Sequence, residues 1–441
     1  MKKLLLSIFV LAVVFSCSKD DETPIPECTV PGNLQVTNIS QTSVTITWES
    51  SNADSSFILE YGESGFALGT GTIVNTTSTS YTINNLAANT TYDYYLTANC
   101  GNGNESDPTS VRSFTTLFPL VVAEFLPNLS ELNLFEGDLE NLRPSVYTYE
   151  YDLITPLFTD YAHKKRFVWM PQGVNAQYVN DYSVLDFPIG TILIKSFYYE
   201  NVLPNNTTRI IETRLMIRKE NEWVFANYIW NDEQTEAVMD NVGGYTLVEW
   251  VQNGETLSTN YRIPSESECF TCHKIGATNT PIGPKPQNLN KIYGYDSGSE
   301  NQLEKLATMG YLNSDYPTDI ETVVNWEDTS QPLDLRVRSY LDINCAHCHS
   351  DDRHCNYRPM RFAFNESWDE ANLGVCVEPQ ELFDGLNYIV SPNNINRSML
   401  YFRVSTTLAQ RRMPLLGRTL VHEEAVALIE DWINSLTTTC D

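Results

Sequence analysis

The same five-residue pattern, Cys-x-x-Cys-His, occurs twice in this chain of 441 residues, at Cys269–His273 and at Cys345–His349. Each copy places two thiols about one helical turn apart and follows them at once with an imidazole. Thiols and imidazoles are the strongest metal ligands and nucleophiles among the side chains. The part of the chain after residue 265 must therefore fold around a group that these side chains bind.

The pattern is the attachment signature of c-type haem. The two thiols add to the two vinyl groups of the porphyrin, and the histidine that follows lies under the iron as a ligand. A zinc site made of four cysteines is the alternative. The two copies lie 76 residues apart, whereas zinc ribbons separate their cysteine pairs by about 15 to 20 residues. A zinc site also gives no reason for the histidines. We therefore expect two covalently bound haem c groups with iron, held by Cys269, Cys272, His273, Cys345, Cys348 and His349.

The second motif lies in a helical context. Leu333, Val337 and Leu341 recur every four residues up to Cys345, so a helix is predicted to end at this motif. Downstream, Met413 stands beside a proline and just before a segment that is apolar at i, i+3 and i+4. The apolar positions of that last predicted helix are Ala425, Leu428, Ile429, Trp432, Ile433 and Leu436.

This arrangement resembles the class I cytochrome c pattern, in which the methionine sulfur is the second axial ligand. The resemblance implies that Met413 binds the second iron, and His/Met ligation suits electron transfer. His347, inside the motif, is interpreted as a bystander.

For the first motif, Met309 lies 36 residues after His273 and is a candidate ligand, with His163 as another. An open iron is the third possibility.

The first 17 residues predict export. Lys2 and Lys3 precede an apolar run from residue 4 to 15, about 12 residues against the roughly 20 of a membrane-spanning helix. The residues before Cys17 resemble a bacterial lipobox, in which the cysteine is acylated. Residues 18–27 then form an acidic tether. We expect an outer-membrane lipoprotein of the cell envelope, either periplasmic or surface-exposed, with a simple secreted protein as the alternative.

Three domains are expected after the tether, so the fold class is multidomain. Residues 28–117 alternate apolar and polar residues in short runs, which is typical of an all-β sandwich. Residues 118–264 form a second β-rich domain with four tryptophans. Residues 265–441, with helices between Pro, Gly and Asn loops, are predicted to form a mainly α diheme domain similar to cytochrome c.

The first of these domains resembles a fibronectin type III module. The residues that carry the resemblance are Pro31, Trp48, Tyr61, Leu86 and Tyr92, the last at the position of a tyrosine corner. Modules of this kind act as spacers or binding platforms, and no chemistry is assigned to this one.

The remaining cysteines suggest disulfides, because an exported protein meets an oxidising compartment. Cys28 and Cys100 lie near the two ends of the first domain and are expected to pair. Cys355 and Cys376 flank a 20-residue segment and are also expected to pair. Cys440 is then left over.

The charge of the chain restricts its partners. Lys and Arg total 28 against 56 Asp and Glu, a net charge of −28. This argues against nucleic-acid binding. Redox proteins are the expected partners, and the basic Arg411, Arg412 and Arg418 near Met413 are predicted to form a docking patch. The oligomeric state is left open.

Residues 145–437 resemble a family of bacterial diheme c-type cytochromes. The motifs that carry the resemblance are the two haem signatures, Arg412-Met413-Pro414, and the segments Pro156–Tyr161, Gly283–Asn290, Asn301–Leu303 and Tyr340–Asn344. The resemblance implies haem binding and redox activity but no substrate.

Three functions remain in competition. The favoured one is an exported electron carrier between redox partners of the envelope, so enzyme activity is uncertain. A diheme enzyme similar to cytochrome c peroxidase, with one open iron, is the second. A surface adhesion or glycan-binding protein with an auxiliary haem domain is the third.

Overall fold

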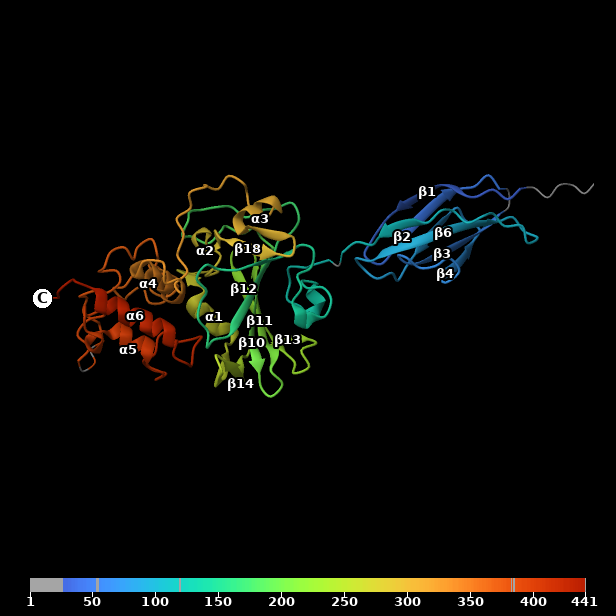
Figure 1. Cartoon of the computed structure of the whole chain (residues 1–441). Helices are drawn as coiled ribbons and strands as arrows, with labels where there is room; N and C mark the ends of the chain where they lie inside the picture. Colours follow the sequence, from blue (N-terminus) through green and yellow to red (C-terminus); the bar gives the residue numbers. More distant parts are fainter. Residues whose placement is uncertain (1–26, 53–54, 119, 382, 384, 441) are drawn as a thin grey trace, which may run out of the picture. The chain divides into compact units, whose positions relative to one another are not determined.

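The computed structural model describes residues 27–52, 55–118, 120–381, 383 and 385–440 (Figure 1). The chain divides into two compact units, Met1–Pro119 and Leu120–Asp441. The expected signal peptide with Cys17, and residues 18–26 of the expected tether, lie outside the described residues. Within the described part, no helix has the length and apolar character needed to cross a bilayer.

The first unit is a β-sandwich of two antiparallel sheets. One sheet has the order β1-β2-β5 and the other β4-β3-β6-β7. The strands are β1 (Gly32–Thr37), β2 (Val44–Glu49), β3 (Ser56–Glu63), β4 (Thr72–Thr76), β5 (Ser80–Ile83), β6 (Thr91–Asn99) and β7 (Arg112–Thr115). Strand β2 shows why the sheets form, because every second residue, from Val44 through Ile46 to Trp48, is buried.

The core of this unit contains the residues expected from its sequence. Trp48, Leu86 and Tyr92 are buried, and Tyr61 packs against them half-buried. The hydroxyl of Tyr92 accepts a hydrogen bond of 3.0 Å from the backbone N–H of Ala87, as a tyrosine corner does.

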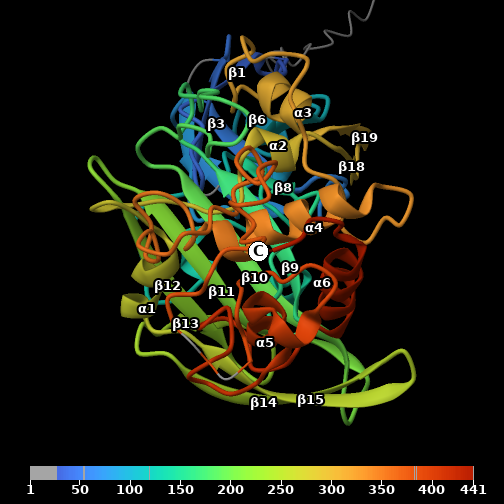
Figure 2. The same cartoon turned by 90° about the vertical axis from the view of Figure 1, so that its left-hand side faces the viewer.

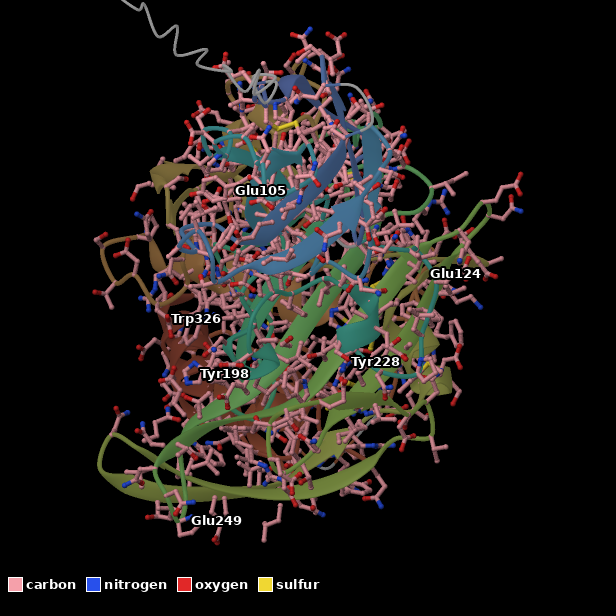
Figure 3. The ribbon with its side chains drawn as sticks, turned by 90° about the vertical axis from the view of Figure 1, so that its right-hand side faces the viewer. Glu105, Glu124, Tyr198, Tyr228, Glu249 and Trp326 are labelled. Atoms are coloured by element: carbon pink, nitrogen blue, oxygen red, sulfur yellow. A yellow bond between two sulfur atoms is a disulfide. The ribbon has the colours of Figure 1, made fainter. Side chains whose placement is uncertain are left out.

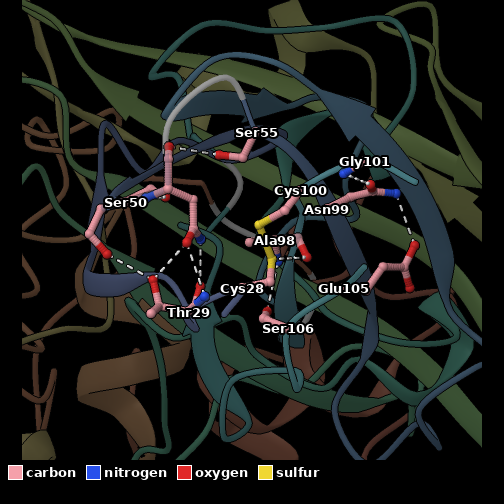
Figure 4. The surroundings of a disulfide bond; sticks show 12 residues. Cys28, Thr29, Ser50, Ser55, Ala98, Asn99, Cys100, Gly101, Glu105 and Ser106 are labelled. Carbon is pink, nitrogen blue, oxygen red and sulfur yellow. Dashed lines mark hydrogen bonds between the residues drawn. A yellow bond between two sulfur atoms is a disulfide. The ribbon is translucent and has the colours of Figure 1, made fainter. Parts of the chain in front are cut away.

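Two disulfides are present among the described cysteines. Cys28 and Cys100 are bonded, which confirms the expected pair (Figure 4). The second prediction was wrong, because Cys376 is bonded to Cys440 and not to Cys355. Cys355 is buried as a free thiol, its N–H bonded to the Cys348 carbonyl. The chain after the last helix returns to Cys376, an approach that spacing along the sequence does not reveal.

The second unit is built on an antiparallel sheet of eight strands. Its path runs β13-β12-β11-β10-β14-β15, while β9 also pairs with β10 and β8 pairs with β9. The strands are β8 (Thr148–Tyr151), β9 (His163–Trp169), β10 (Ile192–Val202), β11 (Thr207–Arg218), β12 (Trp223–Trp230), β13 (Ala237–Met239), β14 (Gly244–Gln252) and β15 (Glu255–Ile263). Figure 3 labels Tyr198 on β10, Tyr228 on β12 and Glu249 on the long β14–β15 hairpin.

Both faces of this sheet are covered. Ile192 and Ile194 of β10 pack into one apolar cluster, whereas Leu193 between them packs on the opposite face with Leu289 and Leu303. Burial on both sides explains why the start of β10, Ile192–Ile194, is apolar at consecutive positions. The four tryptophans expected in this core are all buried.

Short helices and two small hairpins complete the second unit, with two of the 3-10 turns before the sheet and the other elements after it. The helices are α1 (Glu266–Cys272), α2 (Pro286–Leu289), α3 (Gln302–Thr308), α4 (Leu333–Leu341), the π-helical turn η3 (Asp342–Ala346), α5 (Met399–Ser405) and α6 (Glu423–Ser435), with 3-10 turns η1 (Ser130–Leu132), η2 (Leu139–Asn141) and η4 (Ile395–Arg397). The hairpins pair β16 (Lys274–Ile275) with β17 (Thr278–Asn279), and β18 (Ile292–Tyr295) with β19 (Gly298–Asn301). Helices α4, α5 and α6 lie on one side of the sheet (Figures 1 and 2).

The expectation of a mainly α region after residue 265 needs correction. The chain is multidomain and β-rich, and its helices are few and short. Between α4 with η3 and α5, residues 347–394 form turns and irregular backbone in the described part. Proline and glycine interrupt these segments, and neither supports a helix interior. The last helix is confirmed, since Ala425, Leu428, Ile429, Trp432 and Ile433 are buried on one face.

Residues 118–264 and 265–441, expected as separate domains, both lie within the second unit except for residues 118–119. The segment 155–160 connects them. The Thr155 hydroxyl donates to the Val324 carbonyl at 2.7 Å, and the Phe158 N–H donates to the Asn344 side chain at 2.9 Å. The buried Asp160 carboxylate accepts from the N–H groups of residues 419 and 420 at 2.7 and 2.8 Å. These bonds join the sheet to the helical half.

Candidate functional site

The first Cys-x-x-Cys-His motif ends helix α1. The Glu268 carboxylate accepts a hydrogen bond of 3.0 Å from the Ser265 N–H, which satisfies a donor at the start of the helix. Cys269 and Cys272 follow on the last turn. The N–H of His273 bonds to the Cys269 carbonyl at 2.9 Å, so the histidine is fixed directly after the second thiol.

His273 is oriented as a metal ligand. Its Nδ1 lies 3.0 Å from the Thr280 carbonyl oxygen, which can only accept, so Nδ1 carries the hydrogen and the lone pair is on Nε2. Burial lowers the pKa of His273 to about 4 and keeps the imidazole neutral at pH 7. A neutral ring with one nitrogen held by a carbonyl is the usual form of a ligating histidine.

The second motif begins in the π-helical turn η3, which continues helix α4. Asp342 anchors the turn: its buried carboxylate pairs with Lys285 at 3.1 Å and accepts from the Phe364 N–H at 3.1 Å. His349 is buried, and burial lowers its pKa to about 4. Its Nδ1 has no hydrogen-bond partner. Burial also raises the pKa of the Cys345 thiol to about 12, so this group is protonated at neutral pH.

A cavity of about 270 Å³ opens at the second motif. We name it the C-terminal cavity. Its lining brings Cys345, Cys348 and His349 together with Met413, although Met413 lies 64 residues after the histidine. Sequence reasoning missed two further methionines in the lining, Met360 and Met399. No spacing signal identifies them, because they enter from separate loop and helix segments.

Arg418 holds the loop that carries Met413. Its guanidinium donates to the Met413 carbonyl at 2.9 Å and to the Arg403 and Thr406 carbonyls at 3.0 Å. Arg418 is buried, so it is not part of a surface docking patch as its sequence context suggested. Arg411 is exposed and lies over the ring of Phe383 at 4.3 Å.

A second cavity, of about 180 Å³, opens at the first motif. We name it the sheet cavity, because Cys269, Cys272 and His273 form one wall and one face of strands β9–β12 forms the opposite wall. The sheet therefore contributes to the site as well as to the core. Apolar side chains such as Leu193, Phe197 and Phe225 dominate this wall.

Neither candidate for the second ligand of the first motif reaches this cavity. Met309 follows α3 as its C-cap and is 39% exposed, and within the described residues it lines neither cavity. His163 stacks on Tyr198 at 5.3 Å and is also absent from both linings. Lys195 and Met216 enter the sheet cavity instead. In the sequence, the alternation of Lys195 and Met216 with their neighbours shows that both lie on one face of the sheet. It does not show which part of the protein packs against that face.

The two cavities adjoin. Cys272, His347, Pro414 and Leu416 line both. The sulfurs of Cys272 and Cys348 and a ring nitrogen of His347 all lie within 4.8 Å of one another. His347, interpreted as a bystander, is buried between the motifs, with Nδ1 3.2 Å from the Ile343 carbonyl. Cys269 and Cys345 are not members of this group, so the four-cysteine arrangement of a zinc ribbon is not formed there.

The donor sets of the two cavities fit haem c. Each offers two thiols one turn apart, a neutral histidine and apolar lining residues, which is what covalent attachment and iron ligation require. Met413 adds a thioether on the C-terminal cavity, and Lys195 and Met216 add an amine and a thioether on the sheet cavity. The buried, unpartnered Nδ1 of His349 and Nη2 of Arg166 also leave bonding capacity for a further group.

Comparison with protein families assigns the first unit. The family described as Fibronectin type III domain matches residues 29–112. These residues form a fibronectin type III domain. The fibronectin type III domain accounts for the sandwich, the tyrosine corner and the spacing of the core residues, and both cavities lie outside it.

Solved structures resemble the chain over the same region. A redesigned β-sandwich protein shares 29% identity, covering 20% of this chain and 95% of its own, with a TM-score of 0.19. The fibronectin type III domain of the human fibronectin type III domain containing protein 3 shares 24%, covering 22% and 92%, with a TM-score of 0.19. The rat CD45 domains d3–d4 share 12%, covering 26% and 82%, with a TM-score of 0.18. No curated protein matches the chain.

Proposed function

We propose that this chain is an exported diheme c-type cytochrome that carries electrons between redox proteins of the cell envelope. The observation that supports the proposal most is the pairing of each Cys-x-x-Cys-His motif with its own cavity, the two cavities sharing a wall. A zinc ribbon or a pair of unrelated surface motifs would not provide two apolar cavities of this kind.

The residues have defined roles in this proposal. The thiols of each motif, Cys269 with Cys272 and Cys345 with Cys348, would hold the porphyrin through thioether bonds to its vinyl groups. His273 and His349 would bind the iron, His273 through Nε2. Met413 is the second ligand in the C-terminal cavity. When bound, the two haems supply one-electron chemistry at iron.

Other residues hold the proposed ligands in position. Thr280 fixes the tautomer of His273, Arg418 fixes the Met413 loop, and the apolar walls exclude water. The fibronectin type III domain acts as a spacer or platform after a lipid anchor at Cys17. Disulfides in both units support an oxidising compartment, which suits the periplasmic or outer face of the outer membrane.

Haem stoichiometry tests the proposal. Full-length protein produced with its signal and a haem-attachment machinery is expected to carry two covalent haems, measured by mass and by absorption after denaturation. The double variant Cys269→Ala/Cys272→Ala is expected to carry one. Cys355→Ala is the matched control, a cysteine that lines the C-terminal cavity outside both motifs, and it should retain two. Wild-type protein with no covalent haem would refute the proposal.

A metal ion bound by Cys272, His347 and Cys348 is the second candidate. These three groups converge, and hydrogen bonds from Cys348 and His347 lower the pKa of Cys272, which favours the thiolate that a metal requires. Metal analysis separates the two candidates. One tightly bound zinc per chain, lost in Cys272→Ser and without covalent haem, would favour this site over the diheme protein.

A further inference from the structure

Three cations stand in a row across the sheet that forms the sheet cavity. Arg166 of β9 pairs in register with Lys195 of β10, and Lys195 pairs with Arg214 of β11. All three line the cavity that also contains Cys269 and His273. Directly opposed like charges destabilise a sheet. Such a row is also unexpected in a chain with a net charge of −28.

The protein compensates the two ends of the row but not its centre. Arg214 pairs with the buried carboxylate of Glu212, and Arg166 pairs with Asp152 at 2.8 Å. The side chain of Lys195 has neither a hydrogen bond nor an ion pair within the described residues, and its Nζ lies over the Phe197 ring at 4.8 Å.

The outer cation Arg166 is also incompletely satisfied. Its side chain is only 5% exposed, yet Nη2 has no hydrogen-bond partner. Burial and the neighbouring charges of Arg166, Lys164 and Arg214 lower the pKa of Lys195. Two of the three cations of the row thus have a nitrogen without a partner among the described residues. Although the Nη2 of Arg166 is itself enclosed, an anion in the cavity would pair with Lys195 at the centre of the row.

The next row of the same sheet face is apolar. Val168, Leu193, Met216 and Phe225 pair in register from β9 to β12, directly beside the cations. A cationic row and an apolar row therefore lie side by side on this face. A flat apolar ring system with carboxylates along one edge would match both rows at once, whereas a small free anion would use only the cationic row.

We propose that Arg166, Lys195 and Arg214 bind the propionate carboxylates of the haem attached at the first motif, with Lys195 as the central contact. This inference rests on the proposed function, because it concerns the haem of Cys269 and Cys272. It makes these three side chains positioning residues that orient the cofactor and adjust its potential, and Lys195 is not an iron ligand.

Replacement of Lys195 by glutamine tests the inference in the holoprotein. Loss of a cation beside the propionates removes a charge that favours electron uptake, so the potential of the first haem is expected to fall while that of the second stays unchanged. The first haem is identified as the one missing from Cys269→Ala/Cys272→Ala. Infrared bands of the propionate carboxylates, assigned with haem labelled at those carbons, are expected to shift. The spin state is expected to stay as in the wild type.

Lys165→Gln is the matched control. Lys165 is the neighbour of Arg166 on β9, its side chain alternates to the other face, and it does not line the sheet cavity. It makes the same charge change without contact to the row. Equal shifts in potential for Lys165→Gln and Lys195→Gln would overturn the inference, because they would reflect net charge alone.

Two further outcomes are decisive. Unchanged carboxylate bands in Lys195→Gln would overturn the inference, and so would conversion of one haem to a high-spin form, which would make Lys195 an iron ligand. If Lys195→Gln does not accumulate, Arg166→Gln gives the same carboxylate test, and Lys195→Arg should keep the wild-type bands. Wild-type protein with two covalent haems but no effect of these variants refutes this inference alone, whereas absence of covalent haem refutes the proposed function.

Discussion

The two motif histidines, which we propose as iron ligands, are held by different means. His273 is half-buried and its Nδ1 is held by the Thr280 carbonyl, whereas His349 is buried and its Nδ1 has no partner. In the C-terminal cavity a second ligand would therefore help to hold the proposed iron. That ligand is expected to be Met413, whose loop is fixed by the buried Arg418.

Replacement of Met413 by alanine tests this assignment. Loss of the thioether is expected to convert one of the two haems from low-spin to high-spin and to lower its potential, because a methionine ligand stabilises the reduced iron. Electron paramagnetic resonance and a redox titration measure the two effects. Met309→Ala is the control, since Met309 lines neither cavity, and it should match the wild type. A low-spin Met413→Ala protein would assign the ligand to Met360 or Met399.

At the scale of single residues, the sequence predicted what is local. The spacing inside each motif and the Met-Pro step before the last helix were sufficient to select Cys345, Cys348, His349 and Met413, which share one cavity. Lys195 and Met216 could not be found in the same way. They lie on strands more than 50 residues before the first motif, and only the packing of that sheet face on α1 brings them to it.

Among the elements, the short segment 155–160 connects the sheet to the helical half through hydrogen bonds. Asp160 is 2% exposed, and its carboxylate accepts from both N–H groups and the hydroxyl of residues 419–420. This segment overlaps Pro156–Tyr161, one of the motifs that carry the resemblance to diheme cytochromes. Its residues also have a structural role, because their hydrogen bonds join the helical half to the sheet.

Asp160→Ala is expected to destabilise the second unit by roughly 3 kcal/mol, since it leaves buried donors without an acceptor. Denaturant unfolding followed by tryptophan fluorescence measures the change. Asp232→Ala is the control: its carboxylate is 88% exposed and pairs with Arg209 on the surface, so a loss below about 1 kcal/mol is expected. Equal losses for the two variants would show that Asp160 does not join the two halves.

Element prediction succeeded where the pattern was long and regular. The last helix and the sandwich strands follow from periods of 3.6 and 2. The mainly α expectation failed because short apolar runs between prolines fit either a helix turn or an irregular segment packed on a core. The pairing of Cys376 with Cys440 was missed for a related reason: spacing does not show where the chain goes after α6.

For the whole molecule, both candidate sites lie within the second unit. The fibronectin type III domain has its own core and its own disulfide, Cys28 to Cys100. Among the described residues, none before Leu120 lines either cavity. The haem chemistry is therefore expected to be independent of this domain.

Deletion of residues 28–117 is expected to leave the number of haems at two and both potentials unchanged. If the domain is a binding platform, the deletion also removes attachment to a partner or surface. Spectroelectrochemical titration of the deleted and full-length proteins measures the first part. Removal of residues 423–441 is the contrasting deletion, because it takes away α6 and should abolish the folded second unit. A shift in either potential on removal of the fibronectin type III domain would contradict the independence of the two units.

The hydrogen bonds of Asp160 also affect the order in which parts of the second unit fold. They join residue 160 to residue 419, 259 positions later. Contacts between residues so far apart in the sequence form slowly, and they form only after the whole intervening chain is available. If the protein is exported as proposed, residue 419 emerges long after residue 160. The four motif thiols would then remain accessible throughout translocation, and the delay would give the attachment machinery an interval to act before the cavities close over them.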